Sequence, residues 1–480
     1  GVLHAVVLPQ APPVSSLVPV QWDRMLGNDN APAFLSSMSS SVRRRTSTVP
    51  VEPGATCAIS LETVLDMVRR TAGGGVDADA PPMEAGVDSL GAVELRNQLQ
   101  RAVGDSISLS STLMFDHPTA RQVATHLGGS AVAAADKRTV NAQLASTGTH
   151  VEIVGTVVSL PMGGSAVRGV SHCARDLLCV IPLTRWDVEA AARDLLGSPP
   201  AVASRVRHGG FLRDAELFEH RFFTMSAAEA AAMDPQQRQL LEHGYTAVHA
   251  AGRSKASLLG DIIAVNVGQW QSEFGAVLLG TPAGRSVYAS TGFSCSVTCG
   301  RVSFVLGLQG PCASFDTACS ASLVANHGSM RALQRKECVA ALSAGVNMIL
   351  DPATMRGNAV AGFTSVRGRS HTFDARADGY ARGEAIGAVV SRLREVGVRS
   401  AAEMRGSAVR QDGRSASLTA PNGQAQQGVL GASLVDAQAD AGEVATLEAH
   451  GTGTALGDPI EAGAVAAIFL ARRVSMGQSL

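Results

Sequence analysis

The sequence predicts a multidomain chain in which a small all-α helical bundle precedes a larger α/β layered domain. The chain has 480 residues, more than one ordinary domain holds. Apolar residues recur at helical spacing between residues 57 and 129. From residue 150 onward, short apolar runs alternate with helical stretches. That alternation is typical of buried strands in an α/β fold.

The composition narrows the class of protein. Hydrophobic residues make up 45% of the chain and aromatic residues 4%, so the core must rely on Ala, Val and Leu. The formal net charge of −1 gives no reason to expect nucleic acid or an anionic membrane surface as a partner. No apolar run reaches the length of a membrane span.

Cysteine usage points to a reducing compartment. The 8 cysteines show no paired spacing, which argues against a disulfide framework and for the cytoplasm or an organelle such as a plastid. Cys295 and Cys299 lie close in sequence, but no cluster of histidines follows them. We therefore expect no metal site.

Four segments are predicted. Residues 1–56 are broken by Pro, Ser and Arg and are interpreted as the remnant of a preceding domain with a linker. Residues 57–129 form the bundle, residues 130–149 a second linker, and residues 150–480 the α/β domain. The first residues lack a starting Met and a basic region, so we expect the cut end of something larger rather than a signal peptide.

The bundle is predicted from helices with one apolar face each. Their stripes are Leu61, Val64, Leu65 and Val68 in the first helix, and Ala120, Val123, Ala124 and Leu127 in the last. Pro118 is expected in the first turn of the last helix. Between these two, a helix is predicted to begin at "DSLGAVELRNQL".

Ser89 lies at the start of that middle helix, directly after Asp88. Both residue types favour a helix N-cap, which is a purely structural role. A helix N-terminus also suits a phosphodiester, because its free N–H groups and positive dipole end attract an anion. The residues alone leave both interpretations open.

The bundle resembles an acyl carrier protein of the polyketide and fatty-acid synthase type. The resemblance rests on "GVDSLGAVELRNQL" and "LMFDHPTARQVATHL" and covers residues 57–129. It implies that Ser89 carries a covalent 4′-phosphopantetheine arm, attached by a phosphopantetheinyl transferase. Glu84, Asp88 and Glu94 would then offer an acidic face to partner enzymes, or form an ordinary solvated surface.

Cys319, in "FDTACSASLVANH", follows the strand-like "CASF" and precedes a helical stretch. The helix is predicted from the face formed by Leu323, His327, Met330 and Leu333. A lone cysteine is commonly a small buried hydrophobe, which is how we interpret Cys312 and Cys338. A strand-turn-helix junction instead lowers a thiol pKa and favours a nucleophile.

His450 is the histidine best placed to assist such a nucleophile. It follows the strand-like "EVATLEA" and opens the glycine-rich "HGTGTALGDPIEAGA". A dinucleotide loop is an alternative for Gly451 and Gly453, but Leu456 stands where a third glycine is needed. A Cys-His protease is another alternative, although no protease signature is present.

The region from residue 150 resembles a β-ketoacyl synthase, the condensing domain of modular type I polyketide synthases. "DTACSASLVAN" and "EAHGTGTALGDPIEA" are similar to the family's nucleophile and first-histidine motifs, and "MDPQQRQLLE" and "FDARADGYARGEA" stand in the expected order. The resemblance implies a thiolase-like fold of two related α/β halves and a homodimer. It places the nucleophile at Cys319, the histidine at His450, and pantetheine contacts at Thr452 and Thr454.

The implied reaction is an acyl transfer followed by a condensation. Cys319 would accept an acyl chain from a carrier thioester. A malonyl-type extender on a carrier domain would then lose carbon dioxide, with His450 donating to the enolate oxygen, and form a β-ketoacyl product. Partners would be acyl and malonyl thioesters on carrier domains and the other domains of a polyketide synthase.

The sequence also departs from the family pattern. Arg410 stands where Asn is usual and Ala385 where Gly is usual. The family's Lys and second His belong to a later motif that the 480 residues do not contain, so we expect a condensing domain incomplete at its C-terminus and unable to finish condensation. The first segment faintly resembles the end of a ketoreductase. The alternatives are a non-catalytic carrier and docking fragment, or a fatty-acid synthase fragment.

Overall fold

A computed structural model describes most of the two predicted domains. The described residues are 2–7, 59–72, 76–83, 87, 89–104, 108–128, 150–163, 175–193, 199–395 and 402–470. They belong to two units, one made of Gln10–Thr139 with Arg414–Asn422 and the other of Gly1–Pro9, Val140–Gly413 and Gly423–Leu480. The linker predicted at 130–149 and nearly all of 1–56 lie outside the described residues. No helix in the described ranges is both long enough and apolar enough to span a lipid bilayer.

The smaller unit is helical, as predicted. Its helices are α3 (Leu61–Ala72), α4 (Ser89–Val103), α5 (Leu113–Asp116) and α6 (Ala120–Leu127). Val64 and Val68 of α3 are fully buried, and so are Leu95 and Leu99 of α4. The predicted stripe of α6 is buried along its whole length. These apolar faces meet in one core because each helix is amphipathic.

The start of α6 differs from the prediction for Pro118. The helix begins at Ala120, and the hydroxyl of Thr119 caps it by accepting the Gln122 N–H at 3.2 Å. Pro118 therefore precedes the cap and is not in the first turn. A threonine hydroxyl satisfies one of the free N–H groups at a helix start, which a proline cannot do.

The larger unit contains a mixed sheet of six strands. Their order is β6-β5-β7-β8-β2-β9, with bounds β2 (Val151–Ser159), β5 (Ile263–Gln269), β6 (Cys312–Phe315), β7 (Ala340–Asn347), β8 (Ala385–Leu393) and β9 (Ala402–Met404). β5 runs parallel to β6 and β7, whereas β8 is antiparallel to β7 and β2. The carboxyl ends of β5, β6 and β7 thus meet at one edge of the sheet.

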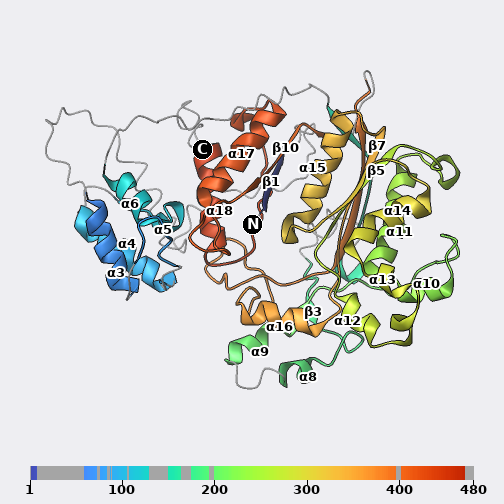
Figure 1. Ribbon diagram of the computed structural model, residues 1–480, viewed down its shortest axis with the longest axis horizontal. Coiled ribbons are helices and arrows are strands. Elements are labelled where there is room, and N and C mark those ends of the chain that lie inside the picture. Colours follow the sequence, from blue (N-terminus) through green and yellow to red (C-terminus); the bar gives the residue numbers. More distant parts are fainter. Residues whose placement is uncertain are drawn as a thin grey trace. The chain divides into compact units, whose positions relative to one another are not determined.

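Helices cover both faces of this sheet. α15 (Ala321–Gln334) lies on one face, and α11 (Pro235–Ala250) and α14 (Cys295–Leu306) lie on the other, as Figure 1 shows. Alternate residues of β5 point to opposite sides, so Val265 packs with the α11 and α14 side and Ala264 with the α15 side. Because both faces are covered by helices, every residue of β5 is buried.

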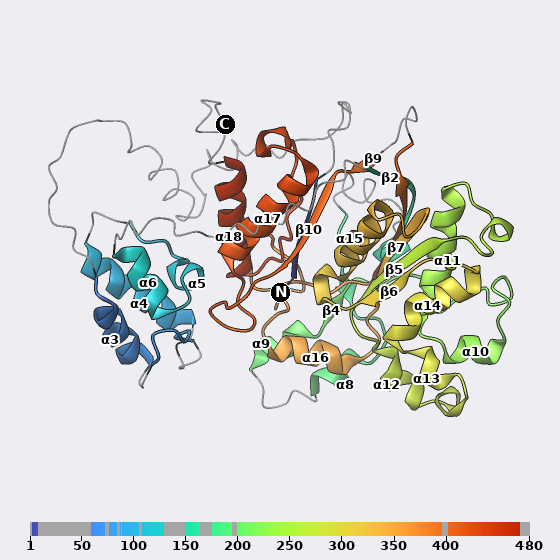
Figure 2. The same cartoon turned by 45° about the horizontal axis from the view of Figure 1, so that its top comes forward.

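A second layer follows the large sheet along the chain. β10 (Gly406–Gln411) pairs with β1 (Val2–Val7) in an antiparallel two-stranded sheet. α17 (Gly423–Ala437) packs on β10, and α18 (Gly457–Val465) packs on α17, as Figure 2 shows.

Shorter elements complete the larger unit. They are the strands β3 (Cys179–Val180) and β4 (His208–Gly209), and the helices α8 (Val188–Arg193), α9 (Pro200–Arg205), α10 (Ala227–Ala232), α12 (Phe274–Leu279), α13 (Ala289–Gly292) and α16 (Pro352–Val360). The 3-10 helices are η1 (Pro161–Gly163), η2 (Lys255–Ser257), η3 (Pro282–Arg285), η4 (Ala318–Ser320) and η5 (Ala441–Glu443), and Ala466–Leu470 forms a π-helical turn.

Three sequence predictions in this unit are wrong. The apolar run "EVATLEA" does not form a strand, because no described strand pairs with it and its side chains are mostly exposed. Leu323 is 42% exposed, since α15 turns Ala321 and Ala325 toward the sheet instead. Cys312 is exposed at the start of the edge strand β6 and is not a packing residue, whereas Cys338 is buried as predicted.

Candidate active site

Cys319 lies in the sharp connection between β6 and α15. β6 ends at Phe315, and Cys319 belongs to the single 3-10 turn η4 that leads directly into the helix. The preceding residue, Ala318, has a φ of 53°, in the left-handed region that residues with a Cβ rarely adopt. Cys319 is exposed in this turn, and the predicted strand-turn-helix junction is present.

Two glycines let α15 begin so close to the sheet. A Cβ on Gly268, near the end of β5, would lie 2.3 Å from the backbone of Ala321. A Cβ on Gly345, near the end of β7, would lie 2.4 Å from the Cβ of Ser322. The first turn of α15 therefore rests directly on the strand ends, where only glycine leaves room.

The structure brings His450 to Cys319, although the two are far apart in the sequence. A hydrogen bond between their side chains lowers the pKa of the Cys319 thiol, while partial burial opposes that shift. The same bond raises the pKa of the His450 imidazole. Both directions favour a thiolate paired with an imidazolium, and thiolate is the reactive form of cysteine.

The pKa of Cys319 is lowered, whereas four other cysteines have a raised pKa. Burial is the first cause that raises the pKa of each of these thiols, which are Cys179, Cys295, Cys312 and Cys338. Cys319 therefore stands apart from them in its acidity. Its hydrogen bond to a histidine is the physical reason.

Glu461, on α18, fixes the backbone at His450. Its two carboxylate oxygens accept the N–H groups of His450 and Gly451 at 2.6 and 2.8 Å. The sequence analysis did not identify this residue. The signal was present in "GDPIEA", which follows the glycine-rich loop. There Glu461 stands four residues after Gly457, the first residue of α18.

Asp458 is a second carboxylate that the sequence analysis missed. It is 4% exposed and accepts the N–H groups of Gly453 and Thr454 at 3.0 and 3.3 Å. Its other oxygen accepts the Phe373 N–H at 2.7 Å. Asp458 thereby joins the loop after His450 to a separate loop of the same unit.

Thr452 and Thr454 lie in the loop that follows His450. Their hydroxyl oxygens are 3.1 Å apart, and the Thr454 hydroxyl accepts the Gly457 N–H at 3.0 Å. Gly451 and Gly453 have φ values of 52° and 74°, so the loop needs glycine at both positions. Both threonines follow His450 within four residues of the chain, and both are half-buried.

His327 is held elsewhere. It is half-buried in α15 with its Nδ1 atom 3.0 Å from the Ser407 hydroxyl. Burial lowers the pKa of His327 to about 4. Its hydrogen bond to β10 gives this histidine a packing role, as predicted.

In the smaller unit, Ser89 is the first residue of α4. The first turn of α4 contains no acidic residue, so nothing within it offsets the positive end of the helix dipole. That setting fits an attached phosphodiester. Glu94 is exposed and lies 4.0 Å from Arg101, while Glu84 and Asp88 lie outside the described residues.

No group of three or more His, Cys, Asp or Glu side chains able to hold a metal ion occurs among the described residues.

Three family models match the chain. The N-terminal domain of β-ketoacyl synthase matches residues 149–395, and its C-terminal domain matches residues 401–478. The phosphopantetheine attachment site matches residues 62–127. The predicted order of a carrier domain followed by a condensing domain is confirmed. The C-terminal ketosynthase domain is matched over residues 401–478, and the expectation that this chain cannot finish condensation stays a prediction.

Similar curated proteins are modular synthases. The chain is 40% identical over 397 residues to polyketide synthase GfsB of Streptomyces halstedii, which covers 80% of this chain and 7% of that protein. It is 41% identical over 408 residues to pikromycin polyketide synthase component PikAII of Streptomyces venezuelae, covering 82% and 11%. The chain therefore spans only about a tenth of the length of such relatives.

Solved ketosynthases share the fold. The ketosynthase from module 6 of the bacillaene synthase of Bacillus subtilis 168 is 30% identical with a TM-score of 0.58, covering 67% of this chain and 54% of that one. The oxazolomycin ketosynthase domain OzmH KS7 of Streptomyces albus JA3453 gives 31% and 0.60, covering 67% and 56%. The predicted thiolase-like fold is confirmed. The chain belongs to the β-ketoacyl synthase family of polyketide synthases and carries a phosphopantetheine attachment domain before its ketosynthase.

Proposed function

We propose that this chain is a carrier and ketosynthase segment of a modular polyketide synthase. Ser89 holds the acyl chain on its phosphopantetheine arm, and Cys319 accepts that chain for decarboxylative condensation with a malonyl-type extender. The observation that carries the proposal is that His450 lies close enough to Cys319 to be the main cause that lowers the pKa of the Cys319 thiol. It supports a nucleophilic thiolate at Cys319, within "DTACSASLVAN", which resembles the family's nucleophile motif.

The first step is an acyl transfer to Cys319. The bound phosphopantetheine would supply a thiol that presents the acyl chain as a thioester. The Cys319 thiolate attacks the thioester carbonyl, a new carbon–sulfur bond forms, and the leaving thiolate takes a proton. The raised pKa of His450 supports its role as the donor of that proton.

The second step needs stabilisation of negative charge. Loss of carbon dioxide from a malonyl-type thioester leaves an enolate, whose oxygen requires a preorganised hydrogen-bond donor. His450 can supply an N–H, and the Glu461 carboxylate fixes the backbone that carries it. A donor that is already in place adds no cost of reorganisation during the reaction.

Thr452, Thr454 and Ser89 serve the pantetheine arm in this proposal. The arm contains two amide groups, and the two threonine hydroxyls beside His450 can donate to or accept from them. Ser89 at the start of α4 suits the anionic phosphodiester that a phosphopantetheinyl transferase installs. Malonyl and acyl thioesters on carrier domains, and other synthase domains, are the expected partners.

We further propose a homodimer formed through the ketosynthase. β6 is at the end of the strand order, so its outer edge has no described strand beside it. An unpaired strand edge is a natural surface for a two-fold partner.

All six described cysteines are free thiols, which supports a reducing compartment such as the cytoplasm.

Mass spectrometry of the intact protein tests the proposal. Incubation with coenzyme A and a phosphopantetheinyl transferase should add one arm, and a later acyl donor should add an acyl group to Cys319. Cys319→Ala should lose the acyl-enzyme and keep the arm, and Ser89→Ala should show the reverse pattern when a small-molecule thioester is the donor. An acyl group that never reaches Cys319 would favour the non-catalytic docking fragment.

A further inference from the structure

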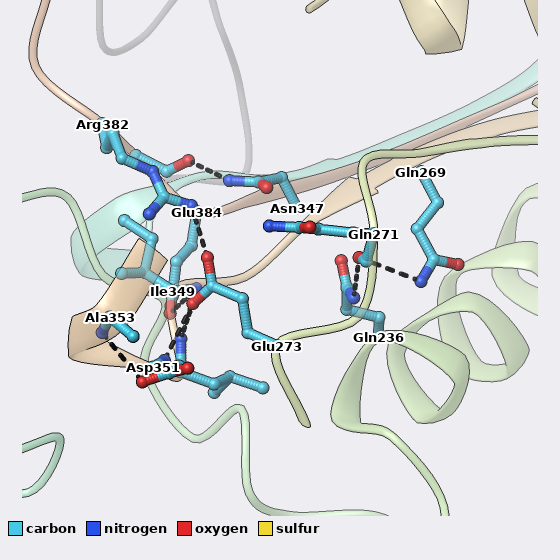
Figure 3. A network of polar contacts seen from close by, with 12 residues as sticks. Gln236, Gln269, Gln271, Glu273, Asn347, Ile349, Asp351, Ala353, Arg382 and Glu384 are labelled. Carbon is cyan, nitrogen blue, oxygen red and sulfur yellow. Dashed lines mark hydrogen bonds and ion pairs between the residues drawn. The ribbon is translucent and has the colours of Figure 1, made fainter. Parts of the chain in front are cut away.

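The loop between β5 and α12 has only four residues, 270–273, and makes many hydrogen bonds. The carbonyl oxygen of Gln271 accepts the side-chain amides of Gln236 and Gln269 at 3.2 and 3.3 Å, as Figure 3 shows. The next residue, Ser272, donates its hydroxyl to the buried Asp234. The two glutamines and the aspartate are each at most 1% exposed, so the loop is anchored in the interior.

The following residue, Glu273, anchors the loop from the other side. Its carboxylate accepts the N–H groups of Leu350 and Asp351 at 2.7 and 2.8 Å. It also accepts the Arg382 guanidinium at 2.8 Å, in a pair whose side chains are each 4% exposed (Figure 3). A buried ion pair that also has these backbone donors resists movement, because breaking it would leave an unpaired charge.

Gln271 adopts an unusual backbone conformation within this rigid loop. Its φ is 31°, which costs free energy for a residue with a Cβ. Such strain persists only where the surrounding contacts determine the conformation. The conformation also lets the Gln271 N–H donate to a carboxylate oxygen of Asp316 at 3.3 Å.

Asp316 connects the loop to the nucleophile. Its second carboxylate oxygen accepts the N–H of Ala318 at 3.2 Å. Ala318 is the left-handed residue directly before Cys319. One carboxylate therefore joins a loop that cannot easily move to the turn that aims the thiol.

We infer that Asp316 is a positioning residue for Cys319, because its carboxylate fixes the left-handed turn at Ala318 to the rigid loop at Gln271. The inference rests on the proposed function, in which Cys319 must keep its contact with His450. The residue type suits the role. An ionised carboxylate accepts two N–H groups at once, whereas an asparagine offers one oxygen and an alanine none.

The negative charge of Asp316, three residues before Cys319 in the chain, would act on the thiol pKa in the opposite direction to positioning, and this allows a sharp test. By charge alone, an aspartate disfavours a nearby thiolate, so its removal should lower the thiol pKa. By positioning, its removal should loosen the contact with His450 and raise the thiol pKa. The sign of the shift separates the two effects.

The experiment compares the full chain with Asp316→Ala and Asp316→Asn. We expect Asp316→Ala to slow acylation of Cys319 by about 10- to 100-fold, as small displacements of reacting groups do. The pH midpoint of Cys319 alkylation by iodoacetamide should move upward. Asp316→Asn keeps one acceptor oxygen and should therefore lose less of the acylation rate. If Asp316→Ala does not fold, Asp316→Asn still gives both measurements.

Two further variants complete the design. Asp187→Asn is the matched control, because Asp187 also accepts two backbone N–H groups but does so at the start of α8. It should leave acylation and the alkylation midpoint unchanged. Glycine adopts the left-handed region readily, so adding Ala318→Gly to Asp316→Ala should recover part of the lost rate.

The outcomes distinguish the two proposals. A wild-type chain that is not acylated at Cys319 would contradict the proposed function, and the alkylation midpoint would still test Asp316. A wild-type chain that is acylated would overturn the inference on Asp316 if Asp316→Ala reacted at the same rate. A midpoint that stays in place or moves downward in Asp316→Ala would overturn it as well.

Discussion

Both candidate nucleophiles lie where a helix starts, and the two sites are built differently. Ser89 is itself the first residue of α4, in a first turn without acidic residues. Cys319 belongs to the 3-10 turn that directly precedes α15, and it follows a left-handed alanine. Its side chain interacts with that of His450. The carrier site consists of a helix end, whereas the ketosynthase site adds a turn, a histidine and supporting carboxylates.

The difference follows from what each side chain must do. Another enzyme modifies a carrier serine, so the serine needs only an accessible place that accepts an anion. A catalytic cysteine must react by itself, which requires a lowered pKa and a positioned partner. A helix N-terminus is therefore sufficient for one task and only a component of the other.

The largest expected effect concerns the carrier serine. Ser89→Ala should abolish the mass gain from coenzyme A, because no other residue is expected to accept the arm. Ser89 is the first residue of α4 and not the residue before it, so the change to alanine should alter the free energy of unfolding by less than about 1 kcal/mol. Intact-protein mass spectrometry measures the first quantity and chemical denaturation the second.

Ser60→Ala is the matched control for that variant. Ser60 precedes α3 in the same unit, and its hydroxyl accepts the Thr63 N–H at 3.2 Å. Its lost cap should cost about 1 kcal/mol of unfolding free energy, while the arm is still attached. If Ser89→Ala still acquired the arm, a helix start would not suffice to identify the site.

The next effect concerns the sheet beneath α15, which has no counterpart in the carrier site. Gly268→Ala would bring a Cβ to 2.3 Å from the Ala321 backbone, so the helix start must shift. We expect a loss of about 3 kcal/mol in unfolding free energy and slower alkylation of Cys319. Gly300→Ala is the control, because a Cβ there meets nothing within 4 Å. It should gain about 0.5–1 kcal/mol. An equal response of both variants would show that the close approach does not matter.

A smaller effect is expected for the histidine. His450→Ala removes the hydrogen bond that lowers the Cys319 pKa, so the thiolate fraction at neutral pH should fall. We expect alkylation of Cys319 near pH 7 to slow by about 10-fold. The control His371→Ala changes a histidine whose Nδ1 atom lies 3.1 Å from the Arg369 carbonyl oxygen. Unchanged alkylation in His450→Ala would mean that the helix end alone activates the thiol, as it would in the carrier.

The pH dependence of labelling also tests whether Cys319 is the more acidic thiol. The pKa of Cys319 is lowered and that of Cys295 is raised. As the pH falls from about 9 toward 6, Cys295 should lose its reactivity first and Cys319 last. Peptide mapping after limited iodoacetamide treatment at each pH measures the order. Equal labelling of both residues at every pH would contradict the assignment.

Sequence reasoning could find much of this architecture for an identifiable reason. β5 and β7 are buried over all or most of their length and β2 and β8 over part of theirs, so their apolar runs stand out against the helical stretches. The stripes of α3 and α6 are visible because a helix buries one face only. The run "EVATLEA" has the same apolar character but finds no described neighbour. A strand is defined by its partners, which local sequence does not contain.

The residues that hold the candidate site were harder to predict than the candidate nucleophile. Cys319 and His450 are conspicuous because of their residue types and the turns around them. Glu461 and Asp458 act through backbone N–H groups that tertiary folding brings to them. A carboxylate that holds a loop has the same appearance in a sequence as one that faces solvent, and only the contacts distinguish the two.

The smallest effect should come from Thr452, which tests whether the loop after His450 contacts the pantetheine arm. Its hydroxyl is 3.1 Å from that of Thr454. Thr452→Val keeps the shape of the side chain and removes the hydroxyl, which is worth about 1 kcal/mol for one neutral hydrogen bond. We therefore expect the KM for an acyl carrier substrate to rise about 5-fold, with little change in kcat. Thr452→Ser keeps the hydroxyl and should behave as the wild type. The effect should vanish with a thioester too short to include the amides of the arm, because the hydroxyl then has no partner. A change in kcat with both substrates would instead mean that Thr452 supports His450 and does not bind the arm.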